Sequence, residues 1–246
     1  MKVISIVPWR YMHHLRHQEY HLVLAHLLDN ENYRAQYQTM KDRYIILDNG
    51  AAEGECEDIE TLYEKSQIID ADEIVLPDEF FDMDKTLKST IHAHRFLRNK
   101  GFDGNTMVVP QGETLDEWIH CAMMFVSQNV GNIIGVPKNL AYLDKPDGRY
   151  KAIEKLLKYG EMPPLHLLGC WYDPNEVYKI YKSFGEFIRT VDSRMPYLYT
   201  MQNKILNPEY YKKPQTREMD IDAVVPDENK LKINIERWEG YCYGTL

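Results

Sequence analysis

The chain has 246 residues, which fits one large α/β domain, and its 44% hydrophobic content with 12% aromatic residues excludes a disordered chain. The formal net charge of −9 argues against a protein that coats nucleic acid non-specifically, although an enzyme with one local basic face remains possible. No stretch approaches the roughly 20 apolar residues that cross a bilayer, and the N-terminal apolar run is too short for a signal peptide. We therefore expect a soluble, cytoplasmic protein.

Short apolar runs recur along the chain. Each run is almost continuously apolar rather than alternating, which is typical of a parallel strand buried on both faces. These runs predict strands at residues 3–7, 44–47, 73–76, 106–109, 132–136, 165–168 and 187–191.

The segments between the runs carry helix signals. Thr114 opens the capping-box pattern TLDE, and Pro174 lies in the first turn of a later helical segment. Gly101, Gly160 and Gly185 follow helical stretches at positions suited to a C-cap. These signals predict helices at residues 57–69, 84–99, 114–128, 149–159 and 173–184.

Alternating strands and helices predict a parallel sheet, and units about 30 residues apart favour a closed barrel over an open sheet. We therefore expect a (β/α)₈ TIM barrel that forms a single domain over residues 1–246. The eighth strand is expected at 231–235, with 223–225 as the alternative. The Tyr-, Pro- and Lys-rich segment 195–226 is expected to be an irregular insertion before that last strand.

Polar residues and glycines follow most of the predicted strands. Asp48, Asp78 and Asp192 come directly after three of them, and Gln111 follows a fourth. In a barrel these positions meet at the C-terminal mouth, where active sites lie. A single Asp after a strand is usually a helix N-cap, but three such acids beside a Gln favour a catalytic site. Carboxylate pairs of this kind carry out glycosyl transfer, with one attacking an anomeric carbon and the other moving a proton.

The sequence lacks the motifs that mark several other classes of site. There is no GxGxxG, GxxxxGK[ST] or GxSxG sequence, and the four cysteines form no CxxC pair. His13 with His14 and His92 with His94 could be metal ligands, but the second pair is spaced i, i+2 on a helix and points to different faces. His166 lies within a strand and is expected to be a core histidine. We expect no metal and no cofactor.

Five motifs, taken in order, resemble those of the tRNA-guanine transglycosylase superfamily. LDNGAAE resembles its DSGGFQ motif, VVPQG its VQGG segment, and IIGVPK its GLAVGE segment. LHLLG resembles its LMGVG segment, and TVDSRMP the strand that carries its nucleophilic Asp. The resemblance covers roughly residues 44–197.

The resemblance assigns a role to each matching residue. Asp192 would be the nucleophile that attacks C1′ of a guanosine, and Asp48 the general acid and base. Asp78 would recognise the N1 and exocyclic amine edge of the base. The base pocket would be completed by Gln111 and the Gly135 N–H, which bind O6, and by Leu168 and Gly169, which line the pocket.

Two departures from the family pattern point to one branch of it. The CxCxxC zinc site that supports tRNA binding is absent, and the base-stacking aromatic is replaced by Ala52. Stacking would then come from Trp9, Phe80, Phe81 or Trp171. The chain thus resembles the compact, zinc-less bacteriophage and bacterial enzymes that insert 7-deazaguanine bases such as preQ0 into DNA. In a phage-encoded enzyme the compartment would be the host cytoplasm.

The expected partners are DNA and a free 7-deazaguanine base. Three alternatives stay open: a tRNA-guanine transglycosylase, a glycosylase that releases the base to water, and a catalytically inactive accessory barrel. One basic stretch, over residues 194–217, could contact the phosphates, although an ordinary solvated loop is as good an interpretation. Its basic residues are Arg194, Lys204, Lys212, Lys213 and Arg217.

Overall fold

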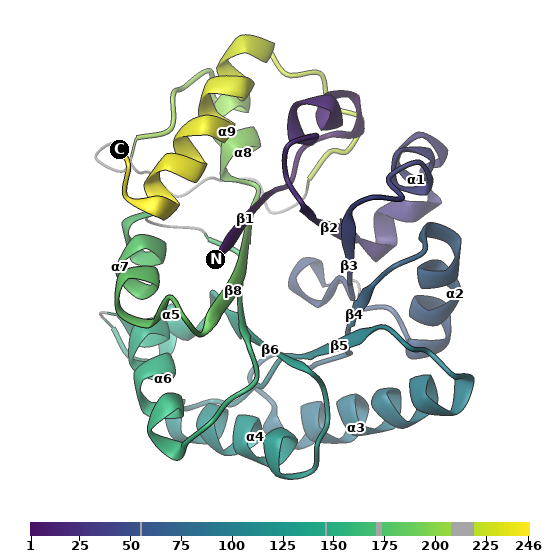
Figure 1. The fold of residues 1–246 in the computed structure, drawn as a ribbon, viewed down its shortest axis with the longest axis vertical. Helices are drawn as coiled ribbons and strands as arrows, with labels where there is room; N and C mark the ends of the chain where they lie inside the picture. The colour runs from purple at the N-terminus through teal and green to yellow at the C-terminus, as the bar shows by residue number, and fades with distance from the viewer. Residues whose placement is uncertain (55, 146, 171–173, 208–218) are drawn as a thin grey trace.

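The computed structural model describes residues 1–246 except 55, 146, 171–173 and 208–218. Eight parallel strands form a nearly closed barrel with helices around it (Figure 1), which confirms the predicted (β/α)₈ TIM-barrel fold. The strands are β1 (Lys2–Ser5), β2 (Tyr20–Leu24), β3 (Tyr44–Asp48), β4 (Glu73–Val75), β5 (Asn105–Val108), β6 (Ile133–Pro137), β7 (Leu165–Leu168) and β8 (Ile188–Ser193).

The strands follow one another in the order β1-β8-β7-β6-β5-β4-β3-β2, so the barrel seam lies between β1 and β2. β1 pairs with β8 from Lys2↔Thr190 to Ser5↔Ser193. At the seam, the side chain of Gln18 accepts a hydrogen bond from the Ser5 N–H at 3.0 Å and donates to the Ser5 hydroxyl at 3.1 Å. A side chain therefore satisfies a backbone group that a strand ladder would otherwise pair.

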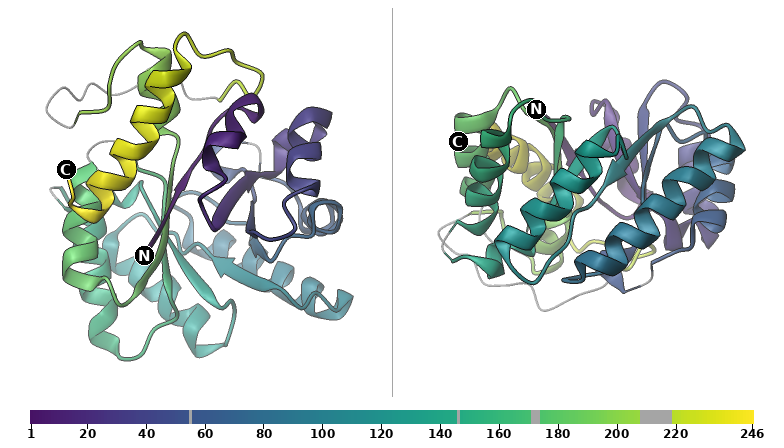
Figure 2. Two further views of the ribbon diagram at one scale, coloured as in Figure 1. Left: turned by 45° about the horizontal axis from the view of Figure 1, so that its top comes forward. Right: turned by 90° about the horizontal axis from the view of Figure 1, so that it is seen from below.

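Helices surround the barrel in all views (Figure 2). Among the described residues, five α-helices begin at a side chain that accepts a backbone N–H, as Asp58 does from Thr61 and Asp82 from Lys85. The α-helices are α1 (Glu31–Gln38), α2 (Ile59–Ile69), α3 (Met83–Lys100), α4 (Leu115–Ser127), α5 (Leu140–Leu143), α6 (Gly148–Leu156), α7 (Pro174–Phe184), α8 (Met195–Met201) and α9 (Glu228–Tyr243). The 3₁₀-helices are η1 (Trp9–Leu15), η2 (Ala25–Asp29), η3 (Ala51–Glu53) and η4 (Leu157–Tyr159). In the described part of the chain, no helix combines the length and the apolar character needed to cross a membrane.

The prediction of an eighth strand at 231–235 was wrong, because these residues belong to helix α9. Asp227 caps the helix by accepting the Lys230 N–H, and Ile233 points outward with 43% exposure. The buried positions of α9 recur at helical spacing: Leu231, Asn234, Ile235, Trp238 and Cys242. The alternative, 223–225, forms no strand either.

The missing strand is β2, near the N-terminus. Only η1 and a short turn separate β1 from β2, so the expected 30-residue spacing does not apply to this unit. Consequently the last strand is β8, and the predicted insertion before the last strand was also wrong. The segment 195–226 follows β8 and begins with helix α8.

The N-terminal end of the barrel is closed by an ion pair. Arg189 of β8 donates to both carboxylate oxygens of Glu73 of β4, at 2.6 and 2.9 Å. The Tyr44 hydroxyl donates to the same carboxylate at 2.9 Å and accepts from Asn105 at 2.7 Å. The Glu73 side chain is fully buried. This polar layer lies at the opposite end of the strands from the site described next.

Candidate active site

Three carboxylates line one cavity at the C-terminal ends of the strands. Asp48 ends β3, Asp78 follows β4, and Asp192 lies near the end of β8, and all three are buried. The cavity has a volume of about 110 Å³, and about 880 Å³ when the open space at its mouth is included. Its other lining residues are Ile6, Leu22, Leu24, Asn49, Ala51, Ala52, Val75, Phe80, Val109, Pro137, Lys138, Asn139, Leu168, Gly169, Cys170 and Arg194.

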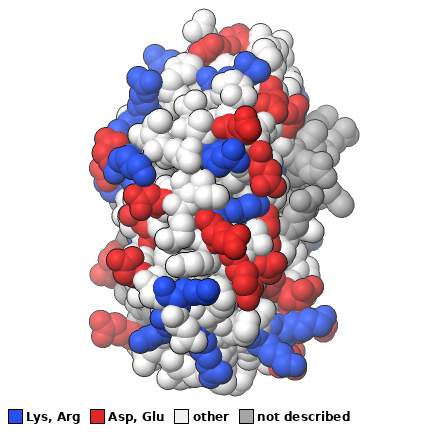
Figure 3. All heavy atoms as spheres, turned by 90° about the vertical axis from the view of Figure 1, so that its right-hand side faces the viewer, with Lys and Arg blue, Asp and Glu red and all other residues white. Residues whose placement is uncertain are grey.

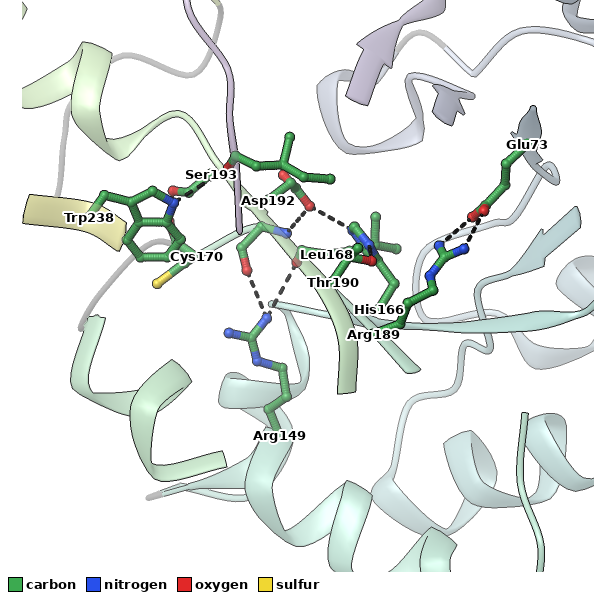
Figure 4. Close-up of polar contacts among 12 residues, drawn as sticks. Glu73, Arg149, His166, Leu168, Cys170, Arg189, Thr190, Asp192, Ser193 and Trp238 are labelled. Atoms are coloured by element: carbon green, nitrogen blue, oxygen red, sulfur yellow. Dashed lines mark hydrogen bonds and ion pairs between the residues drawn. The ribbon is translucent and has the colours of Figure 1, made fainter. Parts of the chain in front are cut away.

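Asp192 is held by two hydrogen bonds from β7 and the turn that follows it. His166 Nε2 donates to its Oδ1 at 3.0 Å, and the Gly169 N–H donates to the same oxygen at 2.8 Å (Figure 4). Burial by itself would raise the pKa of Asp192. The bond and charge of His166, the Gly169 N–H and the nearby Lys138 outweigh burial, so the pKa lies below its ordinary value. Asp192 is therefore ionised at neutral pH.

His166 makes a contribution to the site that the sequence did not reveal. It is fully buried, as expected of a core histidine, but its ring joins Thr190 to the Asp192 carboxylate. While Nε2 donates to Asp192, Nδ1 on the other side of the ring pairs with the Thr190 hydroxyl. This chain fixes the rotation of Asp192. One strand register, His166↔Thr190, brings the two partners together.

Asp78 sits in a different environment. Asn49 Nδ2 donates to its Oδ1 at 2.8 Å, and Gln111 Nε2 donates to its Oδ2 at 2.7 Å. Burial raises the pKa of Asp78 to about 6, although the Asn49 and Gln111 bonds oppose the shift. Each carboxylate oxygen keeps the capacity to accept a further hydrogen bond from a ligand.

The turn after β3 explains why the sequence places Asp48 and Asn49 where it does. Gly50 has a φ of 79°, a conformation that few other residues adopt, and its N–H lies 3.3 Å from Asp48 Oδ2. Asn49 accepts the Ala51 N–H at 2.9 Å while its amide reaches Asp78. The DNG sequence therefore forms a tight turn that joins two of the three acids.

Gln111 and Gly135 are not among the residues that line the cavity. Gln111 lies behind Asp78, and its Oε1 accepts from the Phe81 N–H at 3.4 Å and from Asn139 at 3.3 Å. Gly135 lies within β6, where an added Cβ would come within 2.7 Å of Leu168 Cδ1. Gly135 thus allows close packing of β6 against β7. By contrast, Leu168 and Gly169 do line the cavity.

Arg149 supports the Gly169 turn, and this role was not predicted from the sequence. It is fully buried on α6, and its Nη1 donates to the Gly169 carbonyl at 2.7 Å (Figure 4). Its other nitrogens contact the Glu176 carboxylate at 2.8 and 3.3 Å. Gly169 has a φ of 67°, so Arg149 stabilises a turn that also directs an N–H toward Asp192. A lone arginine at a helix start carries no signal of such a role.

The structure describes two of the five basic residues that the sequence predicted to contact phosphates. Arg194 lines the cavity, whereas Lys204 is exposed and contacts Gln202 at 3.3 Å. Lys212, Lys213 and Arg217 lie outside the described residues. On the face drawn in Figure 3, acidic and basic side chains are interspersed over the described surface. Among the proposed stacking residues, Phe80 lines the cavity and Trp171 lies outside the described residues.

The four cysteines, Cys56, Cys121, Cys170 and Cys242, are free thiols, and all but Cys56 are buried. Cys170 lines the cavity beside Gly169, and its carbonyl accepts from the Ser193 hydroxyl at 3.1 Å. Scans of the chain against protein-family models and against curated proteins find no match.

Proposed function

We propose that the chain is a base-exchange transglycosylase that replaces guanine in DNA with a 7-deazaguanine base of the preQ0 type, through a covalent aspartyl-glycosyl intermediate. The observation that carries the proposal is the contrast between two carboxylates in one cavity. Asp192 is held ionised by donors to one oxygen, while Asp78 is buried with a raised pKa. Such divergent environments assign a nucleophile and a recognition group to separate acids.

In the first displacement an Asp192 oxygen attacks C1′ of the target nucleotide and the C1′–N9 bond breaks. His166 and Gly169 both bind Oδ1, so Oδ2 is the oxygen assigned to the attack. Guanine departs and takes a proton at N9 from Asp48. In the second displacement Asp48 removes the N9 proton of the incoming base, which attacks C1′ and releases Asp192. Two displacements retain the anomeric configuration.

Asp78 is the proposed reader of the base. As a carboxylate it can accept the N1–H and exocyclic amine protons of a guanine-like edge, while Asn49 and Gln111 hold both of its oxygens in place. The apolar side chains of Leu24, Val75 and Val109 line the cavity, and the flat base would pack against them. Guanine and 7-deazaguanines share this polar edge, so one pocket serves the departing and the arriving base.

DNA is the proposed substrate because the mouth holds cationic side chains and the chain lacks the family's tRNA-supporting zinc motif. Arg194 and Lys138 both line the cavity near Asp192. A base within a duplex must first be extruded, at a cost of a few kcal/mol of unstacking. Contacts from Arg194 to the flanking phosphates would offset part of that cost.

The proposal is tested by base exchange with labelled preQ0. Wild type and Asp192→Asn are each incubated with guanine-containing DNA, with tRNA, and with DNA in the absence of any free base. We expect label to enter DNA with wild type alone. Equal labelling by Asp192→Asn would refute the nucleophile assignment.

The other arms separate the remaining alternatives. Label in tRNA but never in DNA would establish the tRNA enzyme instead. Guanine release without an acceptor base, and without exchange, would establish a hydrolytic glycosylase. An absence of both exchange and release, with base and DNA still bound, would indicate an inactive accessory barrel.

A further inference from the structure

We propose a site for a divalent transition-metal ion such as Zn²⁺, formed by His13, His14 and Glu228 and independent of the proposed function. The three ligand atoms lie within 4.8 Å of one another. His13 Nε2 is 3.1 Å and His14 Nε2 is 2.9 Å from the same Glu228 oxygen, Oε1. The two histidines come from η1 and the glutamate from the first turn of α9, on the outside of the barrel.

The hydrogen bonding of His13 orients its ring in the way that metal-ligating histidines are oriented. His13 Nδ1 lies 3.2 Å from the Arg10 carbonyl oxygen, which can only accept, so Nδ1 carries a hydrogen. Nε2, on the other side of the ring, faces Glu228 Oε1 at 3.1 Å. Fixing the tautomer through a backbone carbonyl is also how proteins orient a metal-ligating histidine.

The spacing of the ligand atoms fits a metal. A tetrahedral zinc with bonds of about 2.0–2.1 Å places its ligand atoms about 3.3 Å apart. The two observed separations, 2.9 and 3.1 Å, need to open by only a few tenths of an ångström. Two imidazoles and one carboxylate leave a fourth position for water, and imidazole ligands favour Zn²⁺, Co²⁺, Ni²⁺ and Cu²⁺ over Mg²⁺ or Ca²⁺.

A metal ion can reach this site from solvent, and its binding would stabilise the folded state. The His13 side chain is 47% exposed and that of Glu228 is 52% exposed, so an ion reaches the site directly from solvent. The His14 side chain, 16% exposed, anchors the inner side. The ligands join the N-terminal η1 to the C-terminal α9. A bound ion therefore cross-links the two ends of the barrel chain and raises the stability of the folded state by mass action.

The test uses the full chain, free of any affinity tag and stripped with chelator. Zn²⁺ binding is measured by calorimetry, Co²⁺ binding by its visible absorption, and the unfolding midpoint with and without Zn²⁺. We expect one equivalent to bind, a tetrahedral Co²⁺ spectrum displaced by Zn²⁺, and a higher midpoint with metal. His13→Ala, His14→Ala and Glu228→Gln should each weaken binding at least the roughly tenfold that loss of a supporting contact costs.

His17→Ala is the matched control, because His17 also pairs with a glutamate of α9, Glu239 at 2.7 Å, but is not part of this cluster. Cys56→Ser controls for the exposed thiol. Both controls should bind metal as wild type does. The proposal is overturned if wild type shows no saturable binding, or if the three ligand variants bind as tightly as wild type. The unfolding midpoint in chelator shows that each variant is folded.

Discussion

At the residue scale, the candidate site holds two aspartates in environments that shift their pKa values in opposite directions. Asp192 and Asp78 are both buried aspartates after barrel strands, yet the pKa of one is lowered and that of the other is raised. The difference comes from their partners: a histidine ring and a backbone N–H for Asp192, and two neutral amides for Asp78. The positions of these acids followed from the strand pattern, but their partners lie far away in sequence and could not be predicted.

His166 is predicted to act as a positioning residue for Asp192. In His166→Ala the pKa of Asp192 should rise, and the acid limb of the exchange rate should move to higher pH, since Asp192 attacks only when ionised. A misplaced nucleophile should also cost about 100-fold in rate. His166→Gln keeps an N–H donor and should recover part of the rate. Unchanged pH profiles for both variants would show that His166 only fills the core.

Asp78 should make stability depend on pH in the direction opposite to that of a salt-bridged acid. Its folded pKa of about 6 lies above the ordinary value of 3.8, so the folded state binds the extra proton. The stability of wild type relative to Asp78→Asn should therefore be greatest below about pH 3.8. It should fall by about 3 kcal/mol as pH rises from about 3 to about 7. Denaturant unfolding across this range measures the difference, and a flat or rising difference would contradict the raised pKa.

At the element scale, success and failure of the sequence predictions have distinct physical causes. Seven strands were found because each is a continuous apolar run in a sheet buried on both faces. β2 was missed because a 3₁₀-helix replaces the usual helix before it, which removes the spacing signal. The run at 231–235 was assigned to a strand from five residues, too short a window to show the helical spacing of Leu231, Asn234 and Trp238.

Arg149 is predicted to hold the Gly169 turn after β7. Arg149→Met leaves the Gly169 carbonyl and the Glu176 carboxylate without this partner, so unfolding free energy should fall by about 3–5 kcal/mol. Exchange should also slow, because the Gly169 N–H loses its fixed direction toward Asp192. Lys179→Met removes an exposed α7 pair with Asp147 and should cost less than about 1 kcal/mol. Equal losses in the two variants would refute the role of Arg149.

At the scale of the whole molecule, a stabilising ion pair and the candidate active site lie at opposite ends of the barrel. Glu73 and Arg189 pair across the N-terminal end, while the acids of the candidate site lie at the opposite end of the strands. The sequence predicted the barrel as a whole, because alternation of strand and helix survives the loss of one unit. It gave no sign of the Glu73–Arg189 pair, since charged residues at the start of a strand are usually solvated.

Breaking that pair should lower stability while leaving the site intact. Glu73→Gln leaves Arg189, whose side chain is only 17% exposed, without its ionic partner, so unfolding free energy should fall by about 3–5 kcal/mol. The double variant Glu73→Leu with Arg189→Met should recover much of that loss, because neither charge is then stranded. Base exchange by folded protein should stay at the wild-type level in both. A double variant no more stable than the single would contradict this account.

The covalent intermediate is the central claim, and mapping it is the most direct test. Wild-type protein is mixed with guanine-containing DNA without an incoming base, denatured, digested and analysed by mass spectrometry. The account predicts a deoxyribose-linked adduct on the peptide that carries Asp192, absent from Asp192→Asn and lost when preQ0 is added before denaturation. An adduct on any other residue, or exchange that proceeds with no adduct at all, would contradict it.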